Sequence, residues 1–502
     1  MKGQYTNSIC GVGLPSTQSN KKPNEYIDIT IGVFFDGTGN NKYNIEYNKG
    51  AKYADKKGVY NEKTQKKEID YDSYNQGFTN VAYLWAMYKR SPRYNIAKVY
   101  VEGSGTAPPK ENKQAKSSDK WISSGKEDDN QGLALGKGDY GVEQKLRKAY
   151  ELIIEEIRTI LANYQNPYVS SVTFDIFGFS RGATASRIFA WKALSSHSSF
   201  YTDLKNVLNI GDISKKVSIR FMGLFDTVSS IGLDQIVSDS SKHPYLMIPN
   251  KVKTIVHLVA ANEYRRFFPL TTVSSAHGLD KSCMEYVLPG AHSDIGGGYN
   301  DIEVEFLYME KDYPSQNILK KGSRNRKFRG YMSLETLRDK EWISKEDFNK
   351  ALRKYQERTY RNIDSRMKKP KGIAPYRGVY NTYARIPLQI MYQVAESKGV
   401  VFEKGTKWKD KTLAIPDKYP NLIKVAKYLK GEFFARRDIY TIRMGNTKDK
   451  NGKKVPMGID FIRDTNVDKS LKSIRRDFLH LSAYNQTGFG ATGNNRRGII
   501  EG

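Results

Sequence analysis

A serine between two glycines stands where a strand-like segment passes into a helix-like one. Residues 170–191, SSVTFDIFGFSRGATASRIFAW, are β-branched and aromatic at first, then rich in alanine and arginine at helical spacing. Gly178, Ser180 and Gly182 form the Gly-X-Ser-X-Gly pattern of a nucleophile elbow, a turn too sharp for side chains at the glycines. We therefore predict acyl transfer with Ser180 as the nucleophile, the alternative being an ordinary strand–helix turn.

A serine hydroxyl needs a general base, and the chain offers only six histidines. His292 follows the apolar run MEYVLPGA and precedes SDIGGGY, which predicts a loop at the carboxyl end of a strand. His480, in RRDFLHLSAYN, is the alternative base. The other four histidines are less suitable. His197 lies at the far end of the helix predicted after Ser180, and His257 lies in an apolar run typical of the core. His243 and His277 lie in polar loops.

The acid of such a triad lies between the serine and the histidine in the chain order of α/β-hydrolases. Asp226 ends the apolar run FMGLF and satisfies that order, although a turn or helix-capping aspartate is the alternative. Asp294 is too close to His292 in sequence to be the first choice, and orienting a neighbouring loop is the alternative for it. Asp175, inside the strand before the elbow, is interpreted as structural.

Two backbone N–H groups are needed to stabilise the oxyanion of an acyl transfer. The N–H of Arg181, directly after the nucleophile, lies at the predicted helix start. The second donor is expected in the loop FFDGTGNN, residues 34–41, from Gly37, with Thr38 as the alternative. This loop lacks the Gly-Lys-Ser/Thr ending of a phosphate-binding P-loop.

Strand-like and helix-like runs alternate along the first 300 residues. YIDITIGVFF, NIAKVYV, KKVSIRFMGLF and MEYVL indicate strands, whereas TNVAYLWAMYKRS and VEQKLRKAYELIIEEIRTILANY indicate helices; KTIVHLVAANEYRR fits either. This alternation predicts an α/β fold with an α/β-hydrolase-like, mostly parallel sheet covered by helices, together with an inserted or appended basic, mostly helical module.

The predicted organisation follows changes in composition. Residues 313–371, for example, hold 18 Lys or Arg against 7 Asp or Glu. The predicted units are a flexible leader (1–25), a catalytic domain (26–300) with surface excursions at 42–76 and 107–130, a basic, mostly helical module proposed to dock on membranes (301–460), and a C-terminal segment packing back on the catalytic domain (461–502).

The charge of the chain narrows the class of partner. It has 82 Lys and Arg against 54 Asp and Glu, a net charge of +28, which favours nucleic acid or an anionic membrane surface, with solubility alone as the alternative. Two cysteines exclude a disulfide framework, and no metal or cofactor is expected. Without a signal-peptide pattern or a run of about 18–20 apolar residues, we expect a cytoplasmic product exported, if at all, by another route.

Four linked motifs resemble one known family. FFDGTGNN, FDIFGFSRGA, GLFDTV and GAHSDIGGGY, in this order and spacing, are similar to the DUF2235 α/β-hydrolase family, which includes the Tle1-type phospholipase effectors of the bacterial type VI secretion system. The resemblance covers about residues 27–300 well and the last 30 residues loosely.

The resemblance implies a Ser-Asp-His hydrolase of phospholipase A type that cleaves fatty-acyl esters of membrane phospholipids and acts as an antibacterial effector. It carries the triad roles onto Ser180, Asp226 and His292, with His480 again as the alternative base. It also implies a cognate immunity protein, a spike or tube carrier protein, and secretion by the type VI system to the membrane or periplasm of a target cell.

Two rival functions stay open. A general carboxylesterase would use the same triad on a soluble substrate, because fold does not decide substrate. A nucleic-acid-binding protein on a hydrolase-like scaffold would use the positive charge, but the sequence has no zinc knuckle, RNP motif or helix-turn-helix pattern. We therefore expect no nucleic-acid partner.

Overall fold

The computed structural model describes most of the chain. The described residues are 26–53, 72–113, 120–129, 132–133, 136–230, 244–276, 282–306, 334–351, 353, 376–403, 413–443, 447–448, 454–455, 458–461, 465–482 and 497–500. The predicted leader (1–25) lies outside them, as do His243 and His277.

A six-stranded parallel sheet forms the centre of the fold, in the order β2-β1-β5-β6-β7-β9. The ambiguous segment KTIVHLVAANEYRR supplies the wholly buried strand β7. The predicted α/β class and parallel sheet are confirmed. The strands are β1 (Tyr26–Phe35), β2 (Ile96–Val101), β5 (Tyr168–Phe179), β6 (Val217–Phe225), β7 (Ile255–Ala260) and β9 (Cys283–Leu288).

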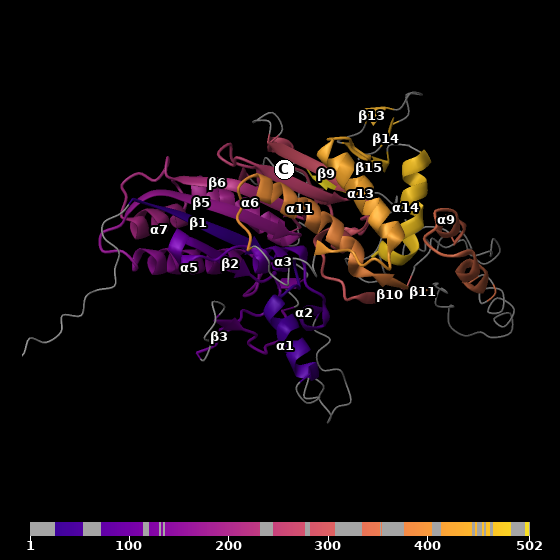
Figure 1. Ribbon diagram of the computed structural model, residues 1–502, viewed down its shortest axis with the longest axis horizontal. Helices are drawn as coiled ribbons and strands as arrows, with labels where there is room; N and C mark the ends of the chain where they lie inside the picture. Colours follow the sequence, from indigo (N-terminus) through magenta and orange to yellow (C-terminus); the bar gives the residue numbers. More distant parts are fainter. Residues whose placement is uncertain are drawn as a thin grey trace, which may run out of the picture.

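Helices cover both faces because the strands are apolar on both sides. On one face Ile31 and Val33 share a core with α5 (Val142–Leu161), α6 (Arg181–Leu194) and α7 (Ser199–Leu208). On the other face Phe34 and Phe177 share a core with α3 (Asn80–Met87), α11 (Arg385–Ser397), α13 (Pro420–Phe434) and α14 (Thr465–Phe478). Figure 1 shows α11, α13 and α14, in orange and yellow, gathered apart from α5 and α7, in purple.

The remaining α-helices and β-strands are short or lie at the periphery of this sandwich. They are α1 (Lys42–Tyr53), α2 (Asp72–Asn75), β3 (Lys110–Glu111), β4 (Trp121–Ile122), β8 (Leu270–Thr271), α8 (His292–Gly296), β10 (Ile302–Phe306), α9 (Leu334–Asp339), β11 (Tyr376–Tyr380), β12 (Tyr440–Arg443), β13 (Thr447–Lys448), β14 (Lys454–Val455), β15 (Gly458–Phe461) and β16 (Ile499–Ile500).

The described part of residues 301–460 shares a hydrophobic core with the central sheet. Trp342 and Met391 belong to the same buried cluster as Val256 and Leu258 of β7. Alongside its helices this region contains short antiparallel pairs, β10 with β11 and β12 with β15. The predicted role of this region at membranes stays a prediction. In the described residues no helix has the length and apolarity that crossing a bilayer requires.

All the predicted site residues of the triad and the oxyanion loop stand near one edge of the sheet. Because parallel strands end at the same side, the residues that follow them meet there. Asp36 follows β1, Ser180 follows β5, Asp226 follows β6, and His292 begins α8 after β9. The fold thus brings together residues that are far apart in sequence.

The glycine after the elbow allows close packing of two strand ends. A Cβ at Gly182 would stand 2.3 Å from Asp36 O and 2.4 Å from Phe35 O, both backbone atoms at the end of β1. The start of α6 and the loop that follows β1 can therefore touch only if residue 182 lacks a side chain.

Gly182→Ala is expected to lower the free energy of unfolding by about 1–3 kcal/mol, because the new methyl group overlaps backbone oxygens that cannot rotate away. Chemical denaturation followed by circular dichroism measures the change. Gly211→Ala is the matched control, since a methyl group there would meet open space among the described residues. Equal stability of the two variants would contradict the proposed packing constraint.

Candidate active site

Ser180 occupies a strained backbone position at the strand–helix junction. Its φ of 57° and ψ of −126° lie in a region that residues with a side chain rarely adopt. Its N–H donates to Phe225 O at 3.1 Å, and its carbonyl accepts the N–H groups of Ala183 and Thr184. These bonds to β6 and to the first turn of α6 hold the serine in the elbow conformation.

Asp226 and His292 form a buried hydrogen-bonded pair. His292 Nδ1 lies 2.5 Å from Asp226 Oδ2, and His292 and Asp226 are 4% and 0% exposed. An ionised carboxylate only accepts hydrogen bonds, so Nδ1 carries the proton and Nε2 keeps its lone pair. Burial lowers the pKa of His292, although Asp226 opposes that shift. The imidazole is therefore neutral near pH 7 and able to accept a proton.

Besides His292, two further residues donate hydrogen bonds to Asp226. Arg497 donates from Nη1 to Oδ1 at 2.6 Å and from Nη2 to Oδ2 at 2.7 Å. The N–H of Ala260 donates to Oδ1 at 2.8 Å. Burial by itself would raise the pKa of Asp226, but the charge of Arg497 and the hydrogen bonds hold it well below its usual range. Asp226 is thus a fixed, ionised acceptor with a φ of 43°.

Ser180 follows Phe179, whose ring contacts that of His292. The ring of Phe179 lies 4.6 Å from that of His292 between centroids, and Val228 N–H donates to Ser180 O at 3.3 Å. Within the described residues no hydrogen bond joins Ser180 Oγ to His292. Nucleophile–base hydrogen bonds are commonly long without substrate and tighten when it binds.

The loop after β1 is organised around the buried carboxylate of Asp36. Oδ1 accepts from Gly37 N–H at 2.8 Å and from Thr79 Oγ1 at 2.6 Å, and Oδ2 accepts from Tyr100 OH at 2.5 Å. Gly37 N–H is thereby directed at Asp36, which does not fit its predicted role as an oxyanion donor. Thr38 N–H, the alternative, makes no hydrogen bond within the described part of the chain.

The side chain of Arg181 joins this loop to the start of α6. Its Nε donates to Thr38 Oγ1 at 2.7 Å, and its Nη2 donates to Leu133 O. Arg181 N–H itself has no hydrogen-bond partner among the described residues. The backbone N–H groups of Thr38 and Arg181 therefore lie on two segments tied together beside Ser180, and both remain available as donors.

The alternative base, His480, belongs to a different pair. Its Nδ1 lies 2.7 Å from Asp294 Oδ1, and its own N–H donates to Asp294 Oδ2 at 2.9 Å. Asp294 Oδ2 also accepts the N–H of Ala291 at 2.8 Å, directly before His292. Tyr299 stacks on the His480 ring with centroids 3.7 Å apart. Asp294 thus orients the loop of His292, with His480 as its partner.

His257 is a satisfied core histidine, as predicted. Thr227 N–H donates to its Nε2 at 3.1 Å, so its Nδ1 carries the proton and donates to Glu285 Oε1 at 2.8 Å. Asp175 is likewise structural, because it pairs with Arg220 at 2.5 Å and accepts from Tyr88 OH at 2.8 Å. Both side chains are therefore engaged in holding the core together.

Three contributors to the site were missed by sequence reasoning. Asp36 lies within the motif FFDGTGNN, in which the sequence predicts a role only for Gly37 or Thr38. Glu263, in ANEYRR, accepts His292 N–H at 3.2 Å and pairs with Arg265. Arg497 stands in the stretch GNNRRGII, which has neither periodicity nor a catalytic pattern. The only sequence signal was a loose family resemblance of the last 30 residues.

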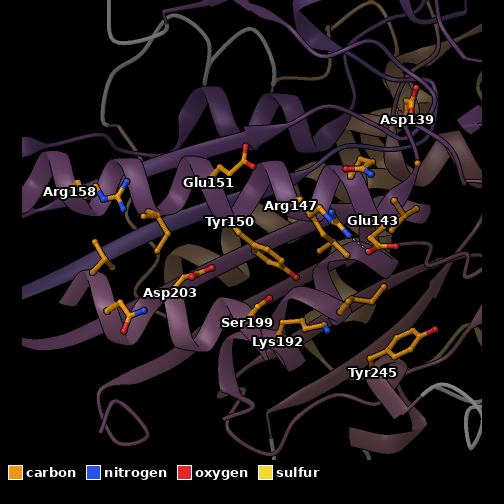
Figure 2. A pocket seen from close by; sticks show the side chains of 18 of the residues that line it. Asp139, Glu143, Arg147, Tyr150, Glu151, Arg158, Lys192, Ser199, Asp203 and Tyr245 are labelled. Carbon is orange, nitrogen blue, oxygen red and sulfur yellow. Dashed lines mark hydrogen bonds and ion pairs between the residues drawn. The ribbon is translucent and has the colours of Figure 1, made fainter. Parts of the chain in front are cut away.

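A large open groove lies elsewhere, between α5, α6 and α7 (Figure 2). It has a volume of about 1900 Å³ and carries the exposed pair Arg147–Glu143 at 2.9 Å. None of the residues of the predicted triad lines it. In the described residues no group of three or more His, Cys, Asp or Glu side chains is arranged to hold a metal ion.

Two comparisons with known proteins link this chain to Tle1-type effectors. Residues 192–318, a span that includes Asp226 and His292, match the family model described as the catalytic domain of Tle1-like type VI secretion phospholipase effectors. A solved structure of the Tle1 effector bound to the VgrG spike superposes with a TM-score of 0.56 at 21% identity, covering 100% of this chain and 99% of that one. The resemblance to Tle1-type effectors is thereby confirmed.

At 21% identity the structural likeness to Tle1 concerns the fold. A crystal structure of an uncharacterized protein from Pseudomonas aeruginosa also matches, at 18% identity over 82% of this chain and 50% of that one, but its TM-score of 0.35 carries no argument. None of the curated proteins matches the chain. The comparisons thus support the fold and the resemblance to the Tle1-like family. The roles of the site residues rest on the geometry of this chain itself.

The carboxyl of Asp36 gives the site a pH-dependent stability. Burial raises its pKa from 3.8 to about 6, although hydrogen bonds from Thr79 and Tyr100 oppose the shift. Because the pKa of Asp36 is higher in the folded than in the unfolded state, its protonated form favours the folded state. This contribution to the free energy of unfolding is complete below pH 3.8 and is lost as pH rises through about 6.

The unfolding free energy of the wild type, measured relative to Asp36→Asn, is expected to fall by about 1 kcal/mol between pH 5 and pH 7.5. The asparagine does not titrate, so the comparison isolates this carboxyl from the others. Denaturant titrations of both proteins at the two pH values measure it. If the difference in unfolding free energy between the two proteins does not change with pH, Asp36 is not the group with the raised pKa.

Proposed function

We propose that this protein is a serine hydrolase of phospholipase A type that cleaves fatty-acyl esters of membrane phospholipids. The observation that carries the proposal is the buried, neutral His292, hydrogen-bonded through Nδ1 to Asp226, beside a serine in the elbow conformation. The match to Tle1-like effectors supports a lipid as substrate.

In the proposed reaction Ser180 Oγ attacks the ester carbonyl carbon while His292 Nε2 takes its proton. The imidazolium, stabilised by Asp226, then protonates the glycerol oxygen as the carbon–oxygen bond breaks. Water attacks the resulting acyl-enzyme, giving one proton to His292, which returns it to Ser180 as the fatty acid leaves. The backbone N–H groups of Arg181 and Thr38 donate to the oxyanion in both halves of the reaction.

We further infer delivery by a type VI secretion system to the membrane or periplasm of a competing bacterium. The solved Tle1 structure contains the VgrG spike as a partner, which supports a spike protein as carrier here. A cognate immunity protein in the producing cell belongs to the same proposal. The net charge of +28 supports attraction to anionic lipid headgroups.

A soluble-ester hydrolase is the rival that shares this chemistry. The same Ser180 and His292 would act, but a lipid surface would not be required. Activity on vesicles compared with a short-chain ester decides between the two.

Ser180→Ala and His292→Ala are each expected to reduce fatty-acid release by at least about 10³-fold, because either change disables the nucleophile–base pair. Release from vesicles of phosphatidylglycerol and phosphatidylethanolamine provides the measurement. His480→Ala is the matched control, with a smaller loss, because His480 acts only through Asp294. The opposite ranking of the two histidines would transfer the base to His480.

Hydrolysis of phosphatidylglycerol vesicles is expected to fall about tenfold or more as salt rises from about 50 to about 500 mM. At the higher concentration the Debye length is only a few ångströms, so exposed lysines no longer attract the surface. Hydrolysis of a neutral short-chain ester by the same preparation is the control and should change little. A wild type that cleaves only the soluble ester would remove the lipid assignment while leaving the triad intact.

A further inference from the structure

Besides His292, the carboxylate of Asp226 has a second partner, the charged Arg497, which lies 271 positions later in the chain. Arg497 precedes β16, whose two residues pair in parallel with β8. Arg497 is 3% exposed, and its guanidinium contacts four oxygen atoms: both oxygens of Asp226, Phe268 O at 2.9 Å and Ala260 O at 3.3 Å. The C-terminal segment is thus tied directly to the carboxylate that holds the base.

We propose that Arg497 is a positioning residue for the catalytic acid. Its forked guanidinium contacts both carboxylate oxygens, which fixes the rotation of the Asp226 carboxylate so that Oδ2 faces His292. This inference rests on the proposed function, since it assigns a role within the same triad.

The fork has an electrostatic effect as well as a geometric one. A guanidinium at 2.6 Å and 2.7 Å neutralises much of the Asp226 charge that would otherwise stabilise an imidazolium at His292. Arg497 therefore keeps His292 neutral, and ready to accept the serine proton, at lower pH. The other charged groups facing His292 are Glu263 and Arg265, which form an ion pair of their own at 2.8 Å.

Loss of the side chain leaves each Asp226 oxygen with one donor, Ala260 N–H on Oδ1 and His292 on Oδ2, but removes the two-point contact that restricts rotation of the carboxylate. A merely structural anchor would affect stability and leave the titration of His292 unchanged. A positioning residue alters the titration and kcat together. This difference separates the two roles.

Arg497→Met is the deciding variant, with Arg158→Met, an exposed arginine on α5, as the control for loss of one positive charge. Fatty-acid release from phosphatidylglycerol vesicles is measured as a function of pH. We expect Arg497→Met to lower kcat about 10²-fold with little change in KM, because the base is misaligned after substrate has bound. The acid limb of its kcat profile should move about one pH unit higher.

Arg497→Lys tests the fork separately from the charge. It should keep the acid limb near that of wild type while recovering only part of kcat, because an ammonium cannot contact both oxygens in the same geometry. It also serves where Arg497→Met fails to fold, as judged by circular dichroism. A lysine variant equal to wild type in kcat would overturn the geometric role.

Nuclear magnetic resonance titration of the His292 ring, assigned with His292→Asn, provides a readout that needs no substrate. The midpoint is expected to be higher in Arg497→Met than in wild type and Arg158→Met. An unchanged midpoint would overturn the proposal even if activity falls. If wild type releases no fatty acid, the proposed function fails, whereas the titration still decides the role of Arg497.

Discussion

A buried ionised carboxylate must be surrounded by donors, and Asp226 imposes that requirement on the whole sheet edge. Without partners, burying such a charge costs several kcal/mol. Its donors come from Ala260 at the end of β7, His292 at the start of α8 and Arg497 before β16. Three chain segments must therefore converge on the end of β6, and the parallel sheet is the element that lets them do so.

The same solution occurs three times in the described part of this core. Each of three buried histidines has its Nδ1 within hydrogen-bond distance of one carboxylate, and the other contacts of the three rings differ. His257 Nε2 is occupied by the N–H of Thr227, whereas His480 is stacked against Tyr299. The pair of His292 is the one that adjoins a serine in a strained turn. The pairs are His257–Glu285, His292–Asp226 and His480–Asp294.

Local patterns accounted for much of the fold and part of the candidate site. The Gly-X-Ser-X-Gly motif predicts the elbow because its geometry depends on adjacent residues, and the alternation of apolar runs predicts the parallel sheet. The choice between Gly37 and Thr38 could not be made this way, because it depends on which N–H the Asp36 side chain captures. The triad assignment stays a prediction until the variants are measured.

Long-range contacts explain what the sequence could not reveal. Arg497 lies 271 positions after Asp226, and no periodicity or spacing encodes their meeting. The sequence alone left His480 as the alternative base, because its pairing with Asp294, 186 positions away, is also a long-range contact. Sequence patterns describe elements well, but they do not say which polar groups share one buried space.

The separation of Asp226 from Arg497 also has a consequence in time. A ribosome adds about 5–20 residues per second, so roughly 15 to 50 s pass between synthesis of the aspartate and synthesis of its arginine. During that interval the sheet and the elbow can form while the acid lacks its forked partner. The set of hydrogen bonds around Asp226 is thus completed only after Arg497 has been synthesised, so this buried carboxylate matures later than the strand that carries it.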